Sequence, residues 1–562
     1  MPRSTLSKAR VLSMLGGRPD ANALASILFA SKAEVAWGEG DDLSVEVTAD
    51  RLDLLSEGGL GLALQGALGE ARGGLRPPPL ALDPPATAVC DRSVAPLRPF
   101  LAALVVRAPG ADGVEAGLLG EAVRFQEVLH ATVGMDRRLA SLGMYPYDRL
   151  QPPFRYAMEP VGSVDFIPLD GRDPTSADAF LAQHPMAARY GALGASEGRL
   201  LTLRDAQGTL MSVPPILNAN PGGAVRAGDR TILLEATGTR SARVSEAIGL
   251  LSLVFAARGW SIAPVEVRSA GGEASGEASA RPRTLHLRSD RLEAVAGRPY
   301  PASEVEHLLA SARLTAHPAP HGWSVEAPAW RPDLLQEVDV IEEVVLAKGV
   351  RAEDGTLPPS PTRGGRRAES RFHERVGRLL LGSGFSEMCS PVLVSEAWVG
   401  RLERGTAIRI SNPVSDLYER VRDSLLLSLM GTLENNLRSG YPQRFYEVGP
   451  VVQVDRASET GTRTSVHLGA LMAEERAGFA DAASMVDYLT GAVAGVGVRE
   501  PAQLPGTVPG RAARVRLAGE VVAELGELVP SVLSEIRVPV PVAWFEVDLS
   551  ALWPLARPAA IT

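Results

Sequence analysis

The sequence predicts an α+β protein built of several domains. Its 562 residues are too many for one hydrophobic core. Segments with the helical spacing of apolar residues, such as 120–131 and 242–258, alternate with short apolar strands such as 231–237. One segment also occurs twice, at 17–55 and at 297–335, which indicates a duplicated unit.

The bulk composition is that of an ordinary globular protein, with 45% hydrophobic and 22% charged residues. No apolar run reaches the ~18 residues that a membrane span needs, and the first residues lack the apolar core of a signal peptide. The two cysteines, Cys90 and Cys389, have neither CxxC spacing nor nearby histidine clusters, so we expect a cytoplasmic protein. A net charge of −9 gives no global attraction to RNA, which would need local patches or a partner subunit.

The two copies of the repeat align at a constant offset of 280 without a gap, and about fifteen of their 39 positions are identical. The two copies match best at the end of the repeat, where Arg51 and Asp53 of the first copy correspond to Arg331 and Asp333 of the second. Two separated copies differ from a solenoid, whose repeats follow in tandem. Beyond the match the copies diverge. The second copy has the acidic residues Asp339, Glu342 and Glu343 where the first has Gly59, Leu62 and Ala63.

Domain boundaries are expected where the sequence is rich in proline or poor in apolar residues. We expect a first domain with repeat copy 1 at 1–75, a proline-rich linker at 76–94, a central domain at 95–268, a linker at 269–281, repeat copy 2 at 282–350, a linker at 351–368 and a last domain at 369–562.

The acidic cluster of the second copy belongs to a helix expected at 334–348. Asp333, with Gln336 three residues on, fits a capping box before this helix, and Asp53 fits the same role in copy 1. Positions 339, 342 and 343 share one helical face a turn apart. Converging carboxylates of this kind suit Mg²⁺. A solvated acidic face, stabilised by the helix dipole, is the alternative.

A second group of polar residues lies on three expected strands. The run 200–218 has the pattern of a strand, a turn and a second strand, and 231–237 is an apolar strand. Alternation places Glu235 and Thr237 on one face. Because burying a carboxylate costs several kcal/mol without hydrogen bonds, Glu235 lies at a solvated strand end, at an edge or in a polar pocket. Candidate companions are Ser212 and Asn218.

Several segments follow one another in the order and spacing of a known family. They are ADRLDLLSEGGL (49–60), MSVPPILN (211–218), LLEATGT (233–239), APAWRPDLLQEVDVIEEVVLAKG (327–349), ISNPVSDLYERVRDSLL (410–426) and RFYEVGPVV (444–452). On these segments the chain resembles the β subunit of phenylalanyl-tRNA synthetase, in the shorter archaeal and eukaryotic form, over nearly its whole length.

The resemblance implies an α₂β₂ heterotetramer that joins phenylalanine to tRNA-Phe, with ATP used by the partner α subunit. It gives the duplicated α/β unit a DNA-binding-like fold. The last domain resembles a class II synthetase catalytic module with an antiparallel sheet, but its final stretch, 526–549, lacks the glycine-rich strand leading to an ATP-binding arginine. We therefore expect no catalytic residue for amino-acid activation here, and a docking surface for α instead.

The central domain resembles the family's editing domain, which hydrolyses tyrosine mischarged onto tRNA-Phe. An apolar pocket rejects an added hydroxyl only weakly, whereas a site built to bind that hydroxyl discriminates strongly. No Cys-His or Ser-His-Asp arrangement is present, so hydrolysis would depend on a positioned water. By motif match, the editing residues are Leu203, Ser212, Asn218, Glu235 and Thr237.

One segment departs from the family. Where the family has Gly-Thr-His-Asp-Leu-Asp, this chain has GMYPYD at 143–148. If this segment contacts the tRNA end, editing is weakened or altered. His130, on the preceding helix, matches the family, with a core histidine as the alternative.

The second repeat copy matches the domain in which the family binds Mg²⁺ near the α subunit. The implied ligands are Asp333, Asp339, Glu342 and Glu343. Two other functions stay open: a stand-alone trans-editing hydrolase and a non-catalytic tRNA-binding scaffold. The synthetase-like last domain argues against the first, while the altered segment 143–148 and the acidic net charge keep the second open.

Overall fold

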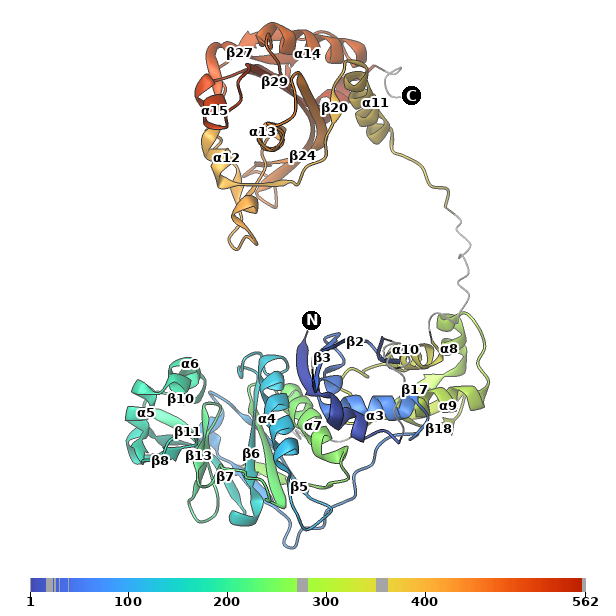
Figure 1. Ribbon diagram of the computed structural model, residues 1–562, viewed down its shortest axis with the longest axis vertical. Coiled ribbons are helices and arrows are strands. Elements are labelled where there is room, and N and C mark those ends of the chain that lie inside the picture. The colour runs from blue at the N-terminus through green and yellow to red at the C-terminus, as the bar shows by residue number, and fades with distance from the viewer. Residues whose placement is uncertain are drawn as a thin grey trace. The chain divides into compact units, whose positions relative to one another are not determined.

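The computed structural model describes the chain as two compact units, 1–356 and 357–562, each taken here by itself (Figure 1). It describes every residue except 1, 17–23, 25–26, 30, 39, 270–281, 350–361 and 558–562. Several sheets with their own helices confirm a mixed α/β, multidomain protein. In the described residues, no helix is long and apolar enough to cross a membrane.

Parts of the expected domain division fall outside the described residues, namely nearly all of the linker at 269–281 and most of the linker at 351–368. The expected linker at 76–94 contains β4 (Thr87–Cys90), which pairs with two strands of the central domain. Its second half is therefore part of that domain's sheet. The other boundaries stay predictions.

In their described residues, the two repeat copies have matching sheets and helices. Each has a three-stranded antiparallel sheet, β1 (Arg3–Ser7), β3 (Asp42–Val47) and β2 (Ala33–Trp37) in copy 1, and β17 (Arg283–Arg288), β19 (Gly322–Ala327) and β18 (Thr315–Ala319) in copy 2. Their helices are α1 (Lys8–Ser13) and α3 (Glu57–Ala67) in copy 1, and α8 (Ser289–Ala296), α9 (Ala302–Ser311) and α10 (Glu337–Lys348) in copy 2. The offset of 280 places β3 on β19 and α3 on α10, so the duplication extends beyond the segment visible in the sequence.

The central domain consists of two packed sheets. The first has the order β15 (Ser261–Pro264), β5 (Phe100–Arg107), β14 (Thr231–Gly238) and β6 (Ala140–Pro146). The second sheet has the order β16 (Glu266–Ser269), β4, β7 (Phe154–Pro160), β11 (Arg199–Arg204), β12 (Leu210–Val213), β13 (Leu217–Asn220), β8 (Asp165–Pro168) and β9 (Thr175–Ser176). A further short strand, β10 (Ala195–Ser196), pairs with β11. Two short helices, α5 (Ala177–Gln183) and α6 (Pro185–Gly194), lie beside it. The strand, turn and second strand expected within 200–218 and the strand expected at 231–237 are confirmed.

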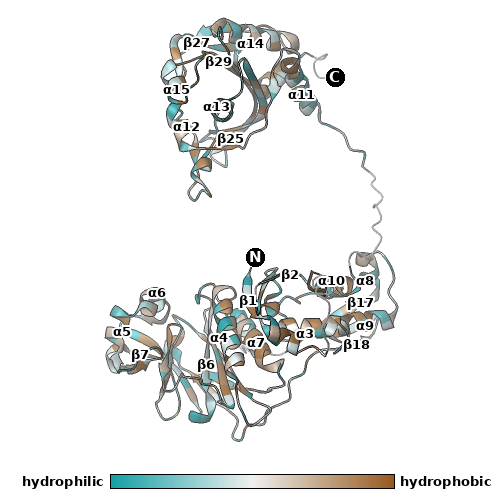
Figure 2. Cartoon of the chain, in the orientation of Figure 1, coloured by the Kyte–Doolittle hydropathy of each residue, from teal (hydrophilic) through white to brown (hydrophobic). Residues whose placement is uncertain are grey.

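Alternate residues of the first sheet enter two different cores. Ile232 and Leu234 of β14 pack with α4 (Ala116–Ala131) and α7 (Ser241–Ala256), while Leu233 packs with residues of the second sheet. Helix α7 is apolar along most of its length (Figure 2), and all its residues from Ala247 on are buried. Glu235 and Thr237 follow Leu233 at intervals of two, so they point towards the second sheet.

The second unit is a seven-stranded sheet with helices on both faces. Its order is β20 (Ser386–Glu387), β24 (Gln443–Val454), β25 (Thr462–Ala473), β29 (Val542–Asp548), β28 (Glu520–Leu528), β27 (Thr507–Leu517) and β26 (Val498–Pro501). Helices α11 (Ala368–Gly382), α14 (Phe479–Val493) and α16 (Leu549–Leu552) share one core, and α12 (Glu396–Arg401), α13 (Leu425–Asn435) and α15 (Pro530–Glu535) share the other. A small sheet, β21 (Leu393–Val394), β23 (Arg420–Val421) and β22 (Ile408–Arg409), completes the unit.

A buried ion pair joins the sequence segments 410–426 and 444–452 in this unit. Arg422 donates from Nη1 to Oε1 of Glu447 at 2.8 Å and from Nε to the carbonyl of Pro450 at 2.9 Å. Both charged side chains are buried. A Cβ at Gly449 would lie 2.5 Å from Nη2 of Arg422, so glycine leaves the room that the guanidinium needs.

A second buried charge group lies at the start of α13. Nδ1 of His467 on β25 is 2.6 Å from Oε1 of Glu546, and its Nε2 is 3.5 Å from Oδ2 of Asp548. Burial alone would lower the pKa of His467, but the hydrogen bonds and charges of Asp548 and Glu546 outweigh burial and raise this pKa to about 9. Glu546 also accepts the backbone N–H of Leu425, which stabilises the N-terminus of α13.

This cluster predicts a stability that falls with rising pH. A histidine whose pKa is raised in the folded state stabilises fully below its unfolded pKa of about 6.5, and the stabilisation is lost as pH rises through about 9. We expect the local unfolding free energy of β25 and β29 to fall by about 3 kcal/mol over this range. Hydrogen exchange followed by mass spectrometry measures it.

In His467→Gln this pH dependence should disappear, whereas His317→Gln, at a mostly exposed position of the first unit, should leave it intact. An unchanged pH dependence in His467→Gln would show that other groups cause it.

Candidate functional site

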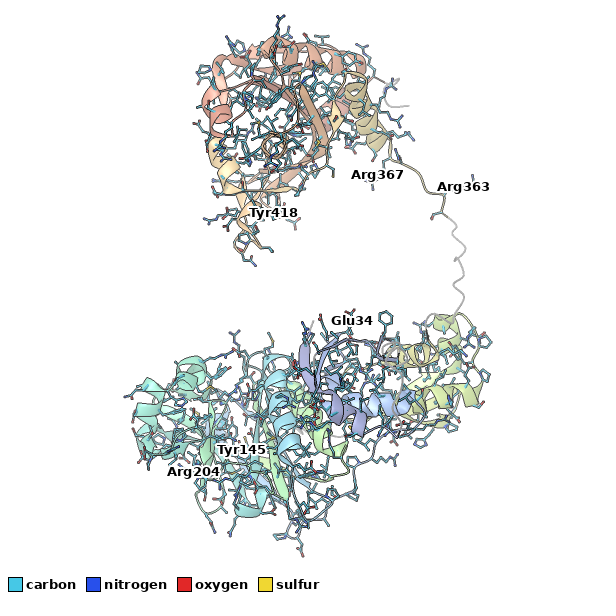
Figure 3. The ribbon with its side chains drawn as sticks, viewed as in Figure 1. Glu34, Tyr145, Arg204, Arg363, Arg367 and Tyr418 are labelled. Atoms are coloured by element: carbon cyan, nitrogen blue, oxygen red, sulfur yellow. The ribbon has the colours of Figure 1, made fainter. Side chains whose placement is uncertain are left out.

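The central domain contains a cavity of about 520 Å³. It lies between α4, β6 and the hairpin of β12 and β13, and Figure 3 labels Tyr145 in this region. Of the five expected editing residues, three line the cavity, and two lie behind it. The lining residues used below are His130, Arg137, Tyr145, Ser212, Asn218 and Glu235.

Glu235 is a buried acidic residue that lines the cavity. It lies on β14, between β5 and β6, and its side chain is 2% exposed. Two of the positions predicted for Glu235, a solvated strand end and a sheet edge, are therefore wrong. The third prediction, a polar pocket, is confirmed. Burial raises the pKa of Glu235 to about 7, although the hydrogen bond from Tyr145, the charge of Arg98 and the nearby hydroxyl of Thr237 oppose this shift.

Tyr145 donates a hydrogen bond to one of the two carboxylate oxygens of Glu235. Its hydroxyl donates to Oε2 of Glu235 at 2.8 Å and lies 2.9 Å from Oγ of Ser212. Because the single phenolic hydrogen goes to the carboxylate, Ser212 donates to Tyr145. A Cβ at Gly143 would lie 2.2 Å from the Tyr145 oxygen and 2.6 Å from Oε2 of Glu235, so this contact requires glycine there. We call Tyr145, Ser212 and Glu235 the inner end of the cavity.

The motif comparison did not place Tyr145 among the site residues. The feature of the sequence that could have indicated Tyr145 was the segment 143–148, where the chain departs from the pattern that the resemblance implies. Antiparallel pairing places Gly143 opposite Glu235 and Tyr145 opposite Leu233, which brings the tyrosine to the same face as the carboxylate. That register is not visible in the sequence of either strand alone.

Leu203 and Thr237 support the cavity from behind. Leu203 on β11 pairs with Ser212 and is buried in the core between the two sheets. Oγ1 of Thr237 accepts a hydrogen bond from Nε of Arg98 at 3.1 Å, and Arg98 also donates to Oγ of Ser141 at 3.0 Å. Arg98 is fully buried, so Thr237 helps to hold a positive charge close behind Glu235.

Asn218 and His130 fix the walls of the cavity. Nδ2 of Asn218 donates to the carbonyl of Met144 at 3.2 Å, which ties β13 to β6. Nε2 of His130 accepts the backbone N–H of Leu142 at 2.9 Å, and its Nδ1 lies 3.1 Å from Glu127. Burial lowers the pKa of His130, and both ring nitrogens have partners, as expected of a core histidine.

The acidic residues of the second repeat copy meet arginines at the contact between the two copies. Arg331 donates from Nη2 to Asp333 and to Glu343, both at 2.7 Å. Arg51 donates in the same way to Asp53, and its Nη1 lies 4.0 Å from Glu343. All five side chains are buried. The Arg-x-Asp motif shared by both copies is thus a pair of buried ion pairs bridged by Glu343.

The expected capping role of Asp333 and Asp53 is wrong. Helix α10 begins after Gln336, and Oδ2 of Asp339 accepts the N–H of Gln336 at 2.7 Å, so Asp339 is the carboxylate of the capping box. In copy 1, Ser56 caps α3 by accepting the N–H of Gly59. Both aspartates lie about one turn before the residue that caps the helix. Their side chains pair instead with the arginine two residues before them.

In this arrangement the four carboxylates do not fit a Mg²⁺ ion. Asp333 and Glu343 face Arg331, Asp339 caps its own helix, and Glu342 pairs with Lys32 at 2.8 Å. Burial alone would raise the pKa of Glu343, but the charges of Arg331 and Arg51 outweigh burial and lower it. Over the described part of the chain, no three His, Cys, Asp or Glu side chains are grouped to hold a metal ion. Mg²⁺ binding stays a prediction.

Removing Arg331 should destabilise the first unit strongly. Arg331→Ala leaves Asp333 and Glu343 as buried charges without their main partner, which typically costs about 3–5 kcal/mol. Urea unfolding of the variant and the parent chain measures this difference.

Arg268→Ala is the matched control, since Arg268 and Glu266 are both mostly exposed and such pairs contribute little to stability. Equal effects of the two substitutions would contradict the structural role of the buried pair.

Two stretches of the chain match described protein families. Residues 354–549 match the Phenylalanyl tRNA synthetase beta chain CLM domain, and residues 285–350 match the tRNA synthetase B5 domain. A phenylalanine–tRNA ligase beta subunit of Korarchaeum cryptofilum is 30% identical over 517 residues, which cover 91% of this chain and 92% of that protein. The chain belongs to the phenylalanine–tRNA ligase β-subunit family.

Further relatives agree with this membership. The beta subunit of Methanocella arvoryzae is 28% identical over 98% of this chain and 100% of that protein. The crystal structure of an N-terminal fragment of the phenylalanyl-tRNA synthetase beta subunit from Pyrococcus horikoshii matches 62% of this chain and 100% of that fragment, with 22% identity and a TM-score of 0.57. The family resemblance seen in the sequence is confirmed, and the fragment shares its fold with the part of this chain that it matches.

Proposed function

We propose that this chain is the β subunit of an α₂β₂ phenylalanine–tRNA ligase, and that its central domain hydrolyses tyrosine mischarged onto tRNA-Phe. The partner α subunit binds ATP and activates phenylalanine. Family membership supports the ligase assignment. The observation that carries the editing assignment is the buried carboxylate of Glu235 at the inner end of a cavity large enough for an amino-acid side chain.

Selection would follow from the hydroxyl group that distinguishes tyrosine from phenylalanine. A tyrosyl group that displaces Tyr145 from the inner end donates this hydroxyl to Glu235, whereas a phenylalanyl group in the same place leaves the buried carboxylate without a donor. Leaving a buried polar group unsatisfied costs about 1–3 kcal/mol, and more for a charged group. The cavity has no nucleophile paired with a base, so water attacks the ester carbonyl directly and the tRNA hydroxyl leaves with a proton.

The second unit supports a docking role without activation. Helix α13 packs on the sheet, and a Cβ at Gly469 would lie 2.6 Å from Cβ of Leu425, so this face of the sheet is filled by the chain itself (Figure 1). Three large apolar side chains of one loop are exposed, and Figure 3 labels Tyr418 among them. They are Val414, Leu417 and Tyr418. Such a loop suits contact with the α subunit.

Mg²⁺ binding through Asp333, Asp339, Glu342 and Glu343 stays a prediction of the family resemblance. No step of the proposed function depends on it, because the described arrangement satisfies each of these carboxylates with protein groups.

Glu235→Ala should relax the preference for tyrosine in editing. We expect the ratio of Tyr-tRNA-Phe to Phe-tRNA-Phe hydrolysis to fall about tenfold to 100-fold, because the buried acceptor is lost. Deacylation of the two labelled tRNAs by the enzyme assembled with α measures this ratio.

Glu159→Ala is the control, since Glu159 is a carboxylate of the same domain that pairs with Arg204 outside the cavity. An unchanged ratio in Glu235→Ala removes Glu235 from the proposed role. No deacylation by the parent enzyme favours a non-editing scaffold.

The chain alone should not catalyse phenylalanine-dependent exchange between ATP and pyrophosphate, because activation belongs to α. Adding purified α subunit from the same genome should produce this exchange. Exchange by the isolated chain would overturn the assignment of activation to the partner.

A further inference from the structure

We propose that Tyr145 occupies the place where the hydroxyl group of a tyrosyl substrate binds, so that Tyr145 must move before the cavity distinguishes tyrosine from phenylalanine. This inference rests on the proposed editing function and names a residue that controls its specificity. In this chain the site that would recognise the tyrosyl hydroxyl is occupied by the chain's own side chain, Tyr145, and editing is therefore less selective.

The hydrogen bonds of Tyr145 are those that a tyrosyl substrate needs. Its phenol donates to Glu235 at 2.8 Å and accepts from Ser212 at 2.9 Å. Both partners were assigned to substrate recognition by motif match. A substrate phenol and the phenol of Tyr145 have the same chemistry, so they compete for the same two groups.

Neither oxygen of Glu235 is open to a ligand while Tyr145 stays in place. Oε2 accepts from Tyr145, and Oε1 is buried and has no hydrogen-bond partner among the described residues. The residue as a whole is 2% exposed, and Tyr145 is 1% exposed. A buried carboxylate oxygen without a donor is costly and is often explained by a functional role. Here it leaves Glu235 able to accept one more donor once the inner end opens.

The local backbone has the space that this contact requires. Gly143, two residues before Tyr145 on the same face of β6, lies so close to both groups that a Cβ would overlap the phenol oxygen. The ring of Tyr145 packs in the core between the two sheets, with Leu233 and Met211.

Competition favours the resident phenol. Tyr145 is held on its strand, so its hydrogen bond to Glu235 costs none of the translational and rotational freedom that a separate ligand loses. A tyrosyl ester displaces it only with binding energy from the tRNA end. Truncating Tyr145 should therefore increase selectivity for tyrosine, which is the opposite of the effect expected for a residue that merely supports Glu235.

The first experiment compares deacylation of Tyr-tRNA-Phe and Phe-tRNA-Phe by enzyme assembled with α. Tyr145→Ala should raise the Tyr/Phe hydrolysis ratio at least about tenfold, and Glu235→Ala in the same chain should abolish the gain. Tyr145→Phe keeps the ring in place and should give no gain. A loss of tyrosine hydrolysis in Tyr145→Ala as large as that in Glu235→Ala would show that Tyr145 supports Glu235, and would overturn the proposal.

Tyr145→His is the second variant for the case in which Tyr145→Ala does not fold. It should also raise the ratio, since the imidazole is smaller than the phenol and leaves part of the inner end open. Aminoacylation of tRNA-Phe by the assembled variants checks that each one folds. An unchanged or lower ratio in every folded truncation contradicts the proposal.

The second experiment uses p-cresol, the side chain of tyrosine as a free molecule, and toluene, which lacks the hydroxyl. Calorimetric titration of the full chain should show that Tyr145→Ala binds p-cresol at least about tenfold more tightly than toluene, while the parent chain shows no such preference. Glu235→Ala in the Tyr145→Ala chain should remove the preference. No preference for p-cresol in Tyr145→Ala overturns the inference.

The two experiments fail in distinguishable ways. If Tyr145→Ala prefers p-cresol but no variant hydrolyses Tyr-tRNA-Phe, Tyr145 occupies a phenol site and the proposed editing function is wrong. If the enzyme hydrolyses Tyr-tRNA-Phe but Tyr145→Ala shows no preference for p-cresol, editing stands and the role given to Tyr145 is wrong.

Discussion

Glu235 lies on an inner strand of a sheet, where its carboxylate is shielded from water and needs donors from the protein. Tyr145 supplies one such donor, Gly143 leaves the space for it, and Ser212 completes the line of hydrogen bonds. Arg98 places a buried positive charge behind them. The pKa of about 7 at Glu235 and the proposed choice between tyrosine and phenylalanine both depend on how this one carboxylate is satisfied.

Buried charges are paired in the same way elsewhere in the chain. The two repeat copies meet through Arg51 and Arg331, with Glu343 between them, and the second unit joins two of its signature segments through Arg422 and Glu447. In each place a buried charged residue has a partner of opposite charge within the protein. Glu235 differs from them, because its closest partner is a neutral phenol that a ligand can replace.

Local patterns in the sequence were sufficient to predict the elements that carry the site. The alternation in 231–237 predicts a strand with Glu235 and Thr237 on one face, and the structure confirms it. Contacts over long sequence distances were not predictable. Tyr145 and Glu235 are 90 residues apart, and their contact depends on the register of β6 against β14. Likewise, a helical face with three carboxylates gives no sign that Arg51 of the other copy will lie beside Glu343.

The most direct test of this account is the NMR signal of Tyr145 in the assembled enzyme, labelled with ¹³C at the tyrosine Cζ and assigned with Tyr145→Phe. The ligand is a tyrosyl-adenosine analogue with an amide in place of the ester, and the phenylalanyl analogue is the control. The account predicts that the tyrosyl analogue shifts the Tyr145 signal, as the phenol leaves Glu235, and that the phenylalanyl analogue does not. Binding of the tyrosyl analogue to the cavity with an unchanged Tyr145 signal would contradict it.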